Sequence, residues 1–210
     1  MRLSILTACT VAGALLSLGL PATGSAAAAK HTAKPAAAPA KAAAVSTWTV
    51  DKANSKITYK SAFGGTAFEG GFGRWDAQIA FDPMNLAGSK VSVSVDLASE
   101  ASGDKDRDEA LPTDDWFNIA KFPKASFVST GFKDLGGGRY QAMGNLTIKG
   151  ITKAVVLPFT LAIMGDTAHM TGQLGLNRTE FKVGEGQFAG PDTVPFELTV
   201  SVAVAAKRAG

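Results

Sequence analysis

Eleven residues near the end of the chain alternate between apolar and polar side chains without exception. From Val194 to Val204 the even positions carry Val, Phe or Leu, and the odd positions carry Pro, Glu, Thr, Ser or Ala. Successive side chains of a β-strand point to opposite faces. The pattern therefore predicts a strand with one apolar face, on which Phe196 and Val200 point into the protein interior.

The same alternation recurs along most of the chain and predicts an all-β protein. One face carries Ile57, Tyr59, Ser61 and Phe63 in residues 55–63, and mostly apolar side chains occupy every second position in residues 75–81 and 91–97. Further strands are expected from residue 125 to the glycines at 136–138, and over residues 139–149, 151–164 and 168–177. Helix is expected only in a charged insertion, over residues 104–110, followed by a turn near residues 114–117. These elements indicate a sandwich or an up-and-down barrel.

The alternation is interrupted at two places, and each interruption predicts a structural feature. Phe68 and Phe72 are out of phase with Trp75, which predicts a β-bulge at Gly71 or Gly73 in one long, bent strand. Residues 155–159 are apolar on both faces of their strand. A second element is therefore expected to cover that strand from outside.

The first 26 residues have the order of a secretory signal peptide. Arg2 precedes an apolar run over residues 3–20, and Pro21 and small side chains follow. We expect cleavage near residues 26–28 and a periplasmic or secreted protein. An uncleaved membrane anchor is the alternative, as is lipidation of Cys9 within the lipobox-like residues 6–9.

Residues 27–46, rich in Ala, Pro and Lys, are expected to form a flexible linker to a domain over residues 47–206. Cys9 is the only cysteine, so disulfides are excluded from the folded domain. Without the six basic residues outside it, the domain holds 15 basic and 18 acidic residues. Because the domain is mildly acidic, nucleic acid is not expected as a partner.

Catalytic and metal-binding residues are scarce. His169 is the only histidine in the predicted domain, and no His, Cys or carboxylate cluster has the spacing of metal ligands. The acidic residues between 104 and 115 lack the glycine and final glutamate of a calcium loop, so they are interpreted as a solvated, capped helix.

Four ordered motifs resemble the YceI-like family. They comprise Arg107-Asp108 with residues 115–127, residues 144–153, residues 176–184, and Asp51 and Ser55 with the turn at residues 81–83. The resemblance extends from about residue 48 to residue 204. The sequence departs from the family pattern at Asn54, Phe63 and Glu109-Ala110, where the family often carries histidine.

The resemblance implies a lipocalin-like, eight-stranded antiparallel barrel with a short helix closing one end. It also implies that the bore holds a long-chain amphiphile, either a polyisoprenoid or a quinone. We therefore expect a non-catalytic, periplasmic protein that binds or transports an isoprenoid lipid or isoprenoid quinone and makes transient membrane contact. No cofactor is expected other than that ligand.

The residues expected to face the bore are mainly aromatic. They are Phe63, Phe68, Phe72, Trp75, Ile79, Phe81, Trp116, Phe117, Phe122, Phe127, Leu146, Ile148 and Phe181. Two other hypotheses stay open at this point. One is a lipid-modifying enzyme that uses Asp108, Glu109 or His169, and the other is a structural or adhesion module with a filled core.

Overall fold

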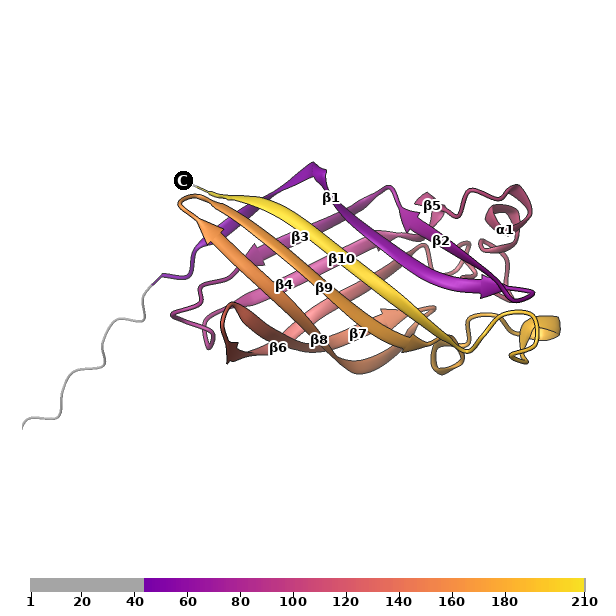
Figure 1. Cartoon of the computed structure of the whole chain (residues 1–210). Coiled ribbons are helices and arrows are strands. Elements are labelled where there is room, and N and C mark those ends of the chain that lie inside the picture. The colour runs from indigo at the N-terminus through magenta and orange to yellow at the C-terminus, as the bar shows by residue number, and fades with distance from the viewer. Residues whose placement is uncertain (1–43, 210) are drawn as a thin grey trace, which may run out of the picture. The chain divides into compact units, whose positions relative to one another are not determined.

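The computed structural model describes residues 44–209, which form antiparallel strands and one short α-helix (Figure 1). The strands are β1 Thr47–Phe63, β2 Thr66–Phe72, β3 Trp75–Ala80, β4 Lys90–Asp96, β5 Glu100–Ala101, β6 Lys124–Gly136, β7 Arg139–Ile148, β8 Ile151–Met164, β9 Thr167–Asn177 and β10 Glu197–Arg208. The helix is α1, Lys105–Ala110. Helix α1, β4 and β6 to β9 lie close to the predicted bounds, whereas β1 begins eight residues before the expected residue 55 and β10 begins three residues after the expected residue 194.

The strands close into a barrel. They follow the order β10-β9-β8-β7-β6-β4-β3-β1, and β1 then pairs with β10. β2 and β3 share one position of the ring, because both pair with β1 at different heights. β5 pairs with β2 as β4 pairs with β3, so β4 and β5 share the next position. The ring therefore has eight positions, and the expected all-β, lipocalin-like, eight-stranded barrel is confirmed.

The irregularity between Phe72 and Trp75 is a strand break rather than the predicted bulge. The Gly73 N–H donates to the Ser99 carbonyl (3.0 Å) and the Arg74 N–H donates to the Ser99 hydroxyl (2.9 Å). The segment after β4 thus supplies hydrogen bonds that a continuous ladder would have made. The two-residue break resets the phase, so Phe72 and Trp75 both face the interior.

Helix α1 begins as the sequence predicts. Asp104 is its N-cap, and its carboxylate accepts a hydrogen bond from the Arg107 N–H (3.1 Å). Asp106 and Asp108 lie in the first turn, where the positive end of the helix dipole favours acidic side chains.

Two expectations about exposure are wrong. Phe196 precedes β10 and does not line the cavity, unlike Val194 and Leu198 in the same phase; its ring lies 5.5 Å from the Arg178 guanidinium carbon. Val156 on β8 is 45% exposed, so the outer face of this strand is not covered there. Leu157 and Phe159 of this segment face the bore, whereas Val156 lies on the exposed outer face.

The predicted signal peptide and residues 27–43 of the predicted linker lie outside the described residues. Residues 44–46 form no helix or strand and lead directly into β1. A search of residues 44–209 finds no helix with the length and apolar character needed to cross a membrane.

Candidate functional site: an apolar cavity in the barrel

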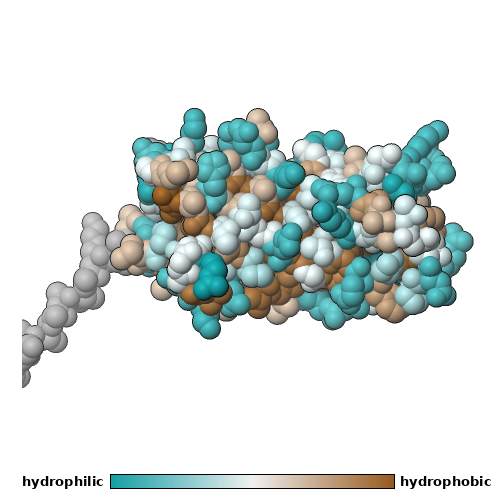
Figure 2. Space-filling model, viewed as in Figure 1, coloured by the Kyte–Doolittle hydropathy of each residue, from teal (hydrophilic) through white to brown (hydrophobic). Residues whose placement is uncertain are grey.

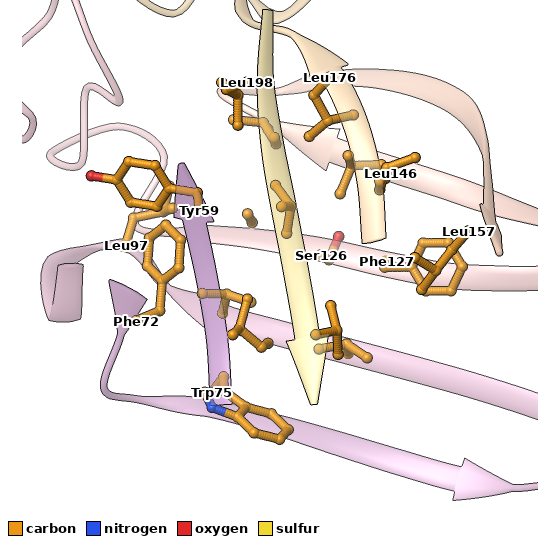
Figure 3. A pocket seen from close by; sticks show the side chains of 18 of the residues that line it. Tyr59, Phe72, Trp75, Leu97, Ser126, Phe127, Leu146, Leu157, Leu176 and Leu198 are labelled. Atoms are coloured by element: carbon orange, nitrogen blue, oxygen red, sulfur yellow. The ribbon is translucent and has the colours of Figure 1, made fainter. Parts of the chain in front are cut away.

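A cavity of about 590 Å³ occupies the interior of the barrel. Side chains from β1, β2, β3, β6, β7, β8, β9 and β10 point into the same space (Figure 3). The inward positions are those that the period of two places on one face, such as Val200 and Val202 on β10. An eight-stranded barrel is wide enough to hold one small ligand if its inward side chains leave space, and here they do.

Twelve of the thirteen residues expected to face the bore line this cavity. They are Phe63, Phe68, Phe72, Trp75, Ile79, Phe81, Trp116, Phe117, Phe127, Leu146, Ile148 and Phe181. Phe122 does not, which corrects its assignment. It lies on the turn before β6, where its ring packs on Gly150 so closely that a Cβ there would be 2.7 Å from it. Contact of the twelve with a ligand stays a prediction.

The sequence analysis missed aliphatic lining residues. They include Ile57, Val93, Leu157, Leu174, Leu176 and Leu198. These residues occupy the inward positions of alternating strands, so the period of two identifies them, whereas the thirteen predicted residues are mainly aromatic. The bore is therefore more aliphatic than expected.

Two glycines let aromatic rings lie flat against the barrel wall. A Cβ on Gly70 would be 2.5 Å from the Tyr59 ring, and a Cβ on Gly144 would be 2.5 Å from the Phe127 ring. Each ring covers the backbone of a neighbouring strand, where any side chain would push it into the bore. The glycines thereby help to keep the cavity open.

Packed aromatic rings close one end of the cavity. The Phe81 ring lies 5.1 Å from Phe132, 5.7 Å from Tyr140 and 6.1 Å from Phe159. Trp48 caps the cluster, and its indole N–H donates to the Phe81 carbonyl (2.8 Å). We call these five residues the aromatic floor. Edge-to-face rings pack densely, so the floor is a rigid end of the bore.

Arg178 organises the loop between β9 and β10 near the opposite end. It is 3% exposed and its guanidinium donates to six backbone carbonyls at 2.6–3.1 Å. The acceptors are Val183, Gly184, Phe188, Gly190, Val194 and Pro195. We call this arrangement the Arg178 clasp. Burial lowers the pKa of Arg178, but a guanidinium stays charged at any physiological pH.

A second buried cation joins the clasp to the loop after α1. The Lys149 ammonium donates to the Asp114 carbonyl (2.6 Å), the Lys182 carbonyl (2.8 Å) and the Glu185 carboxylate (2.9 Å). The ion pair with Lys149 lowers the pKa of Glu185, chiefly through the hydrogen bond. Lys149 and the clasp hold Trp116 and Phe181, which both line the cavity.

Polar groups gather beside α1, where the β1–β2 hairpin meets the cavity. The Tyr59 hydroxyl donates to the Glu100 carboxylate, and Arg107 lies over the Phe68 ring, 4.2 Å from its centroid. The Asp108 carboxylate accepts from the Ser102 N–H (2.8 Å) and hydroxyl (2.6 Å), which lower its pKa. Tyr59 and Arg107 line the cavity, so this polar rim is where an amphiphile's polar end has hydrogen-bonding partners.

Glu100 gives the polar rim a predicted pH dependence. Burial raises the pKa of its carboxyl, so the ionised form destabilises the fold above the unfolded pKa of about 4.3. Glu100→Gln is therefore expected to raise the free energy of unfolding at pH 7.5, by about 1 kcal/mol or less because the side chain is only partly buried. The gain should vanish near pH 4, in urea unfolding curves recorded at both pH values.

Glu69→Gln is the control for this prediction, since Glu69 is exposed on the neighbouring strand. It should change stability little at either pH. If Glu100→Gln instead destabilises the protein at pH 7.5, the hydrogen bond from Tyr59 outweighs the cost of burying the carboxylate.

Of the residues in the enzyme hypothesis, Asp108 and Glu109 lie on α1, whereas His169 lies on β9. His169 is exposed on β9, between Ala168 and Met170, which line the cavity. The Glu109 carboxylate is exposed on α1 and lies 3.6 Å from the Lys105 ammonium. Within residues 44–209 no group of three or more His, Cys, Asp or Glu side chains is placed to hold a metal ion.

A closed, eight-stranded antiparallel barrel around one apolar cavity defines a lipocalin-like protein. The YceI-like domain family matches residues 48–206. The chain belongs to this family, and the resemblance noted in the sequence is confirmed.

Two relatives match half or more of this chain. A UPF0312 protein of Vibrio cholerae is 31% identical over 134 residues, 62% of this chain and 71% of the relative. One from Shewanella denitrificans is 36% identical over 106 residues, which span half of this chain and 56% of the relative.

Solved structures show the same fold. The crystal structure of BcnA from Burkholderia cenocepacia is 34% identical, with a TM-score of 0.73 over 76% of this chain and all of BcnA. A polyisoprenoid binding domain from Saccharophagus degradans is 12% identical, with a TM-score of 0.62 over 77% of this chain and 98% of that domain. At that identity the likeness shows the fold alone.

Proposed function

We propose that the protein binds a long-chain isoprenoid lipid or isoprenoid quinone in the barrel cavity and carries it through the periplasm without chemical change. The observation that carries this proposal is the cavity of about 590 Å³ enclosed by inward-facing aliphatic and aromatic side chains. Family membership and the shared fold of a polyisoprenoid binding domain support the choice of ligand. The leader-like residues 1–26 support the location.

The energetics favour a long chain over a short one. Burying a methylene contributes about 0.8 kcal/mol, so each five-carbon unit contributes roughly 3 kcal/mol before costs. Loss of translational freedom and ordering of the chain offset several kcal/mol of that. Several isoprene units therefore leave a net gain large enough for the lipid to survive purification.

The polar rim suits the head group of such a ligand. Tyr59, Asp106 and Arg107 line the cavity at the polar rim, whereas the aromatic floor offers apolar contacts. We infer that the head group lies at the rim and that the chain extends toward the floor. The rim offers both donors and acceptors, so a neutral hydroxyl or quinone carbonyl fits it.

The experiment is to identify the lipid that co-purifies with the protein and to displace it. Leu157 lines the cavity, whereas its neighbour Val156 points outward on the same strand. Leu157→Trp is expected to reduce lipid per mole of folded protein at least fivefold, because the indole fills the space of the chain. Val156→Trp should leave the lipid content unchanged, as measured by mass spectrometry of solvent extracts.

The enzyme hypothesis predicts a different outcome. His169→Ala and Glu109→Gln should leave both the amount and the chemical identity of the lipid unchanged if the protein only binds it. An altered lipid in these two variants, with unchanged retention in Leu157→Trp, would contradict the carrier function and favour catalysis. Folding of every variant is checked by far-ultraviolet circular dichroism.

A further inference from the structure

The barrel wall has a break in its strand pairing on one side, between β1 and β3. Thr47 pairs with Ala80 and Trp48 pairs with Ile79, and the next residue of β1 paired on this side is Ile57, with Phe72 of β2. Residues 49–56 of β1 therefore have no register partner on β3. Along this stretch β1 pairs with β10 alone, through residues 49–51 and 56.

Specific hydrogen bonds stabilise the segment of β1 that departs from β3. Three extra residues lie in β1 opposite β10, between the pairs Asp51–Ala205 and Lys56–Ala203. The Ser55 hydroxyl both donates to the Ala205 carbonyl (3.2 Å) and accepts from its N–H (2.9 Å), and so replaces the missing ladder bonds. The Asp51 carboxylate accepts from the Asn54 amide (2.9 Å) within the same arch.

One side chain spans the break. The Lys52 ammonium donates to the Trp75 carbonyl of β3 and lies 3.5 Å from the Asp76 carboxylate. It also lies 3.8 Å from the centroid of the Trp75 ring. Trp75 is buried and lines the cavity. Lys52 therefore links β1 to β3 on the outside, directly over a side chain that faces the bore.

A second hollow lies against the same part of the wall. Thr49, Val50, Lys52 and Gln78 line it, and so do Trp48, Ala77 and Ile79, which also line the bore. A single layer of side chains thus separates the outer hollow from the cavity. On the face of the barrel drawn in Figure 2, apolar residues (brown) lie between polar residues (teal).

The Lys52 contacts are weak compared with those at the cavity ends. The aromatic floor is densely packed, and the Arg178 clasp satisfies six carbonyls at once. The Asp76 carboxylate is exposed and the Lys52 side chain is half exposed, so water replaces their contacts readily. Of these three structures, the Lys52 bridge opens with the smallest loss of interactions.

We propose that the bore has a lateral entrance between β1 and β3, and that Lys52 is the latch that sets the rate at which an apolar ligand passes through it. This inference rests on the proposed binding function and adds a route to it. A long chain then leaves sideways through the wall and need not be drawn out lengthwise past the polar rim. The opposing route is the rim itself, where Phe63 is 42% exposed beside the cavity.

The test measures exchange rate rather than affinity, with all-trans-retinol as a fluorescent isoprenoid probe. Transfer of retinol from the protein to phosphatidylcholine vesicles is followed by stopped-flow fluorescence. Lys52→Gln is expected to speed transfer at least fivefold, and Lys52→Arg, which keeps the charge, should stay within twofold of wild type. Lys60→Gln removes the charge of an exposed β1 lysine that lines neither hollow and should also stay within twofold.

A reversible staple tests the same route from the opposite direction. Thr47 and Ala80 are register partners at the paired end of the β1–β3 seam, next to the unpaired residues 49–56. A disulfide between Thr47→Cys and Ala80→Cys, with Cys9→Ser, would keep this end from parting and so limit how far the entrance can open. Transfer should slow at least fivefold when the pair is oxidised and recover on reduction. Bound retinol with equal rates in Lys52→Gln and Lys60→Gln, or with no effect of the staple, overturns the lateral entrance alone. Failure of wild-type protein to bind retinol overturns the proposed function as well.

Discussion

Replacing Arg178 with methionine is expected to lower the free energy of unfolding by more than about 3 kcal/mol. The substitution leaves six carbonyls without their donor in a site that is 3% exposed. Methionine matches much of the volume of arginine, so the loss reports on unsatisfied hydrogen bonds rather than on a cavity. Guanidinium chloride unfolding measures the effect.

Two further substitutions make this prediction specific. Arg178→Lys keeps the charge but offers three donors instead of five, so an intermediate loss is expected. Arg74→Met removes an exposed pair with Asp96 (2.8 Å) and should cost at most about 1 kcal/mol. A loss in Arg178→Met no larger than that in Arg74→Met would show that the clasp does not hold the β9–β10 loop.

The strands of this protein could be predicted because one face of nearly every strand lines the same apolar interior. Alternation therefore records burial directly, and β8 and β9 have the expected bounds within one residue. Closure of the ring could not be predicted from alternation, since the strands of a β-sandwich show the same alternation of apolar and polar residues. Closure depends on pairing β1 with β10, about 150 residues apart, and the family resemblance pointed to it.

Two of the wrong expectations fall where a residue contacts a partner far away in the sequence. Ser99 supplies acceptors to Gly73 and Arg74, which turns a predicted bulge into a break. The Arg178 guanidinium lies over the Phe196 ring, and Phe196 does not line the cavity although it is in phase with Val194 and Leu198. In both cases the partner lies more than 15 residues away, where no local pattern records it.

The candidate site also has a part that the sequence predicts and a part that it does not. Its apolar wall follows from alternation, and twelve aromatic or aliphatic candidates line the cavity. Phe122 lies on a turn, where a period of two carries no information. The contacts of Arg178, Lys149 and Lys52 could not be predicted. These side chains donate to backbone carbonyls that only the folded chain brings near them.

A carboxylate on the inner face of β10 is expected to disrupt the fold and ligand binding together. Val200 lines the cavity between Tyr59 and Leu174, its register partners on β1 and β9, which line it too. Val200→Asp should lower the free energy of unfolding by about 2–4 kcal/mol at pH 7.5 and abolish co-purifying lipid. Burial should raise the pKa of the new carboxyl, so part of the stability returns as the pH falls toward 5 and the group becomes neutral.

Ser201→Asp is the matched control, because Ser201 points outward between Thr58 and Gln173 and should change stability by about 0.5 kcal/mol or less. Urea unfolding at pH 5 and pH 7.5 measures both variants, and equal losses from the two neighbours would mean that the inward face of β10 has been assigned to the wrong residues.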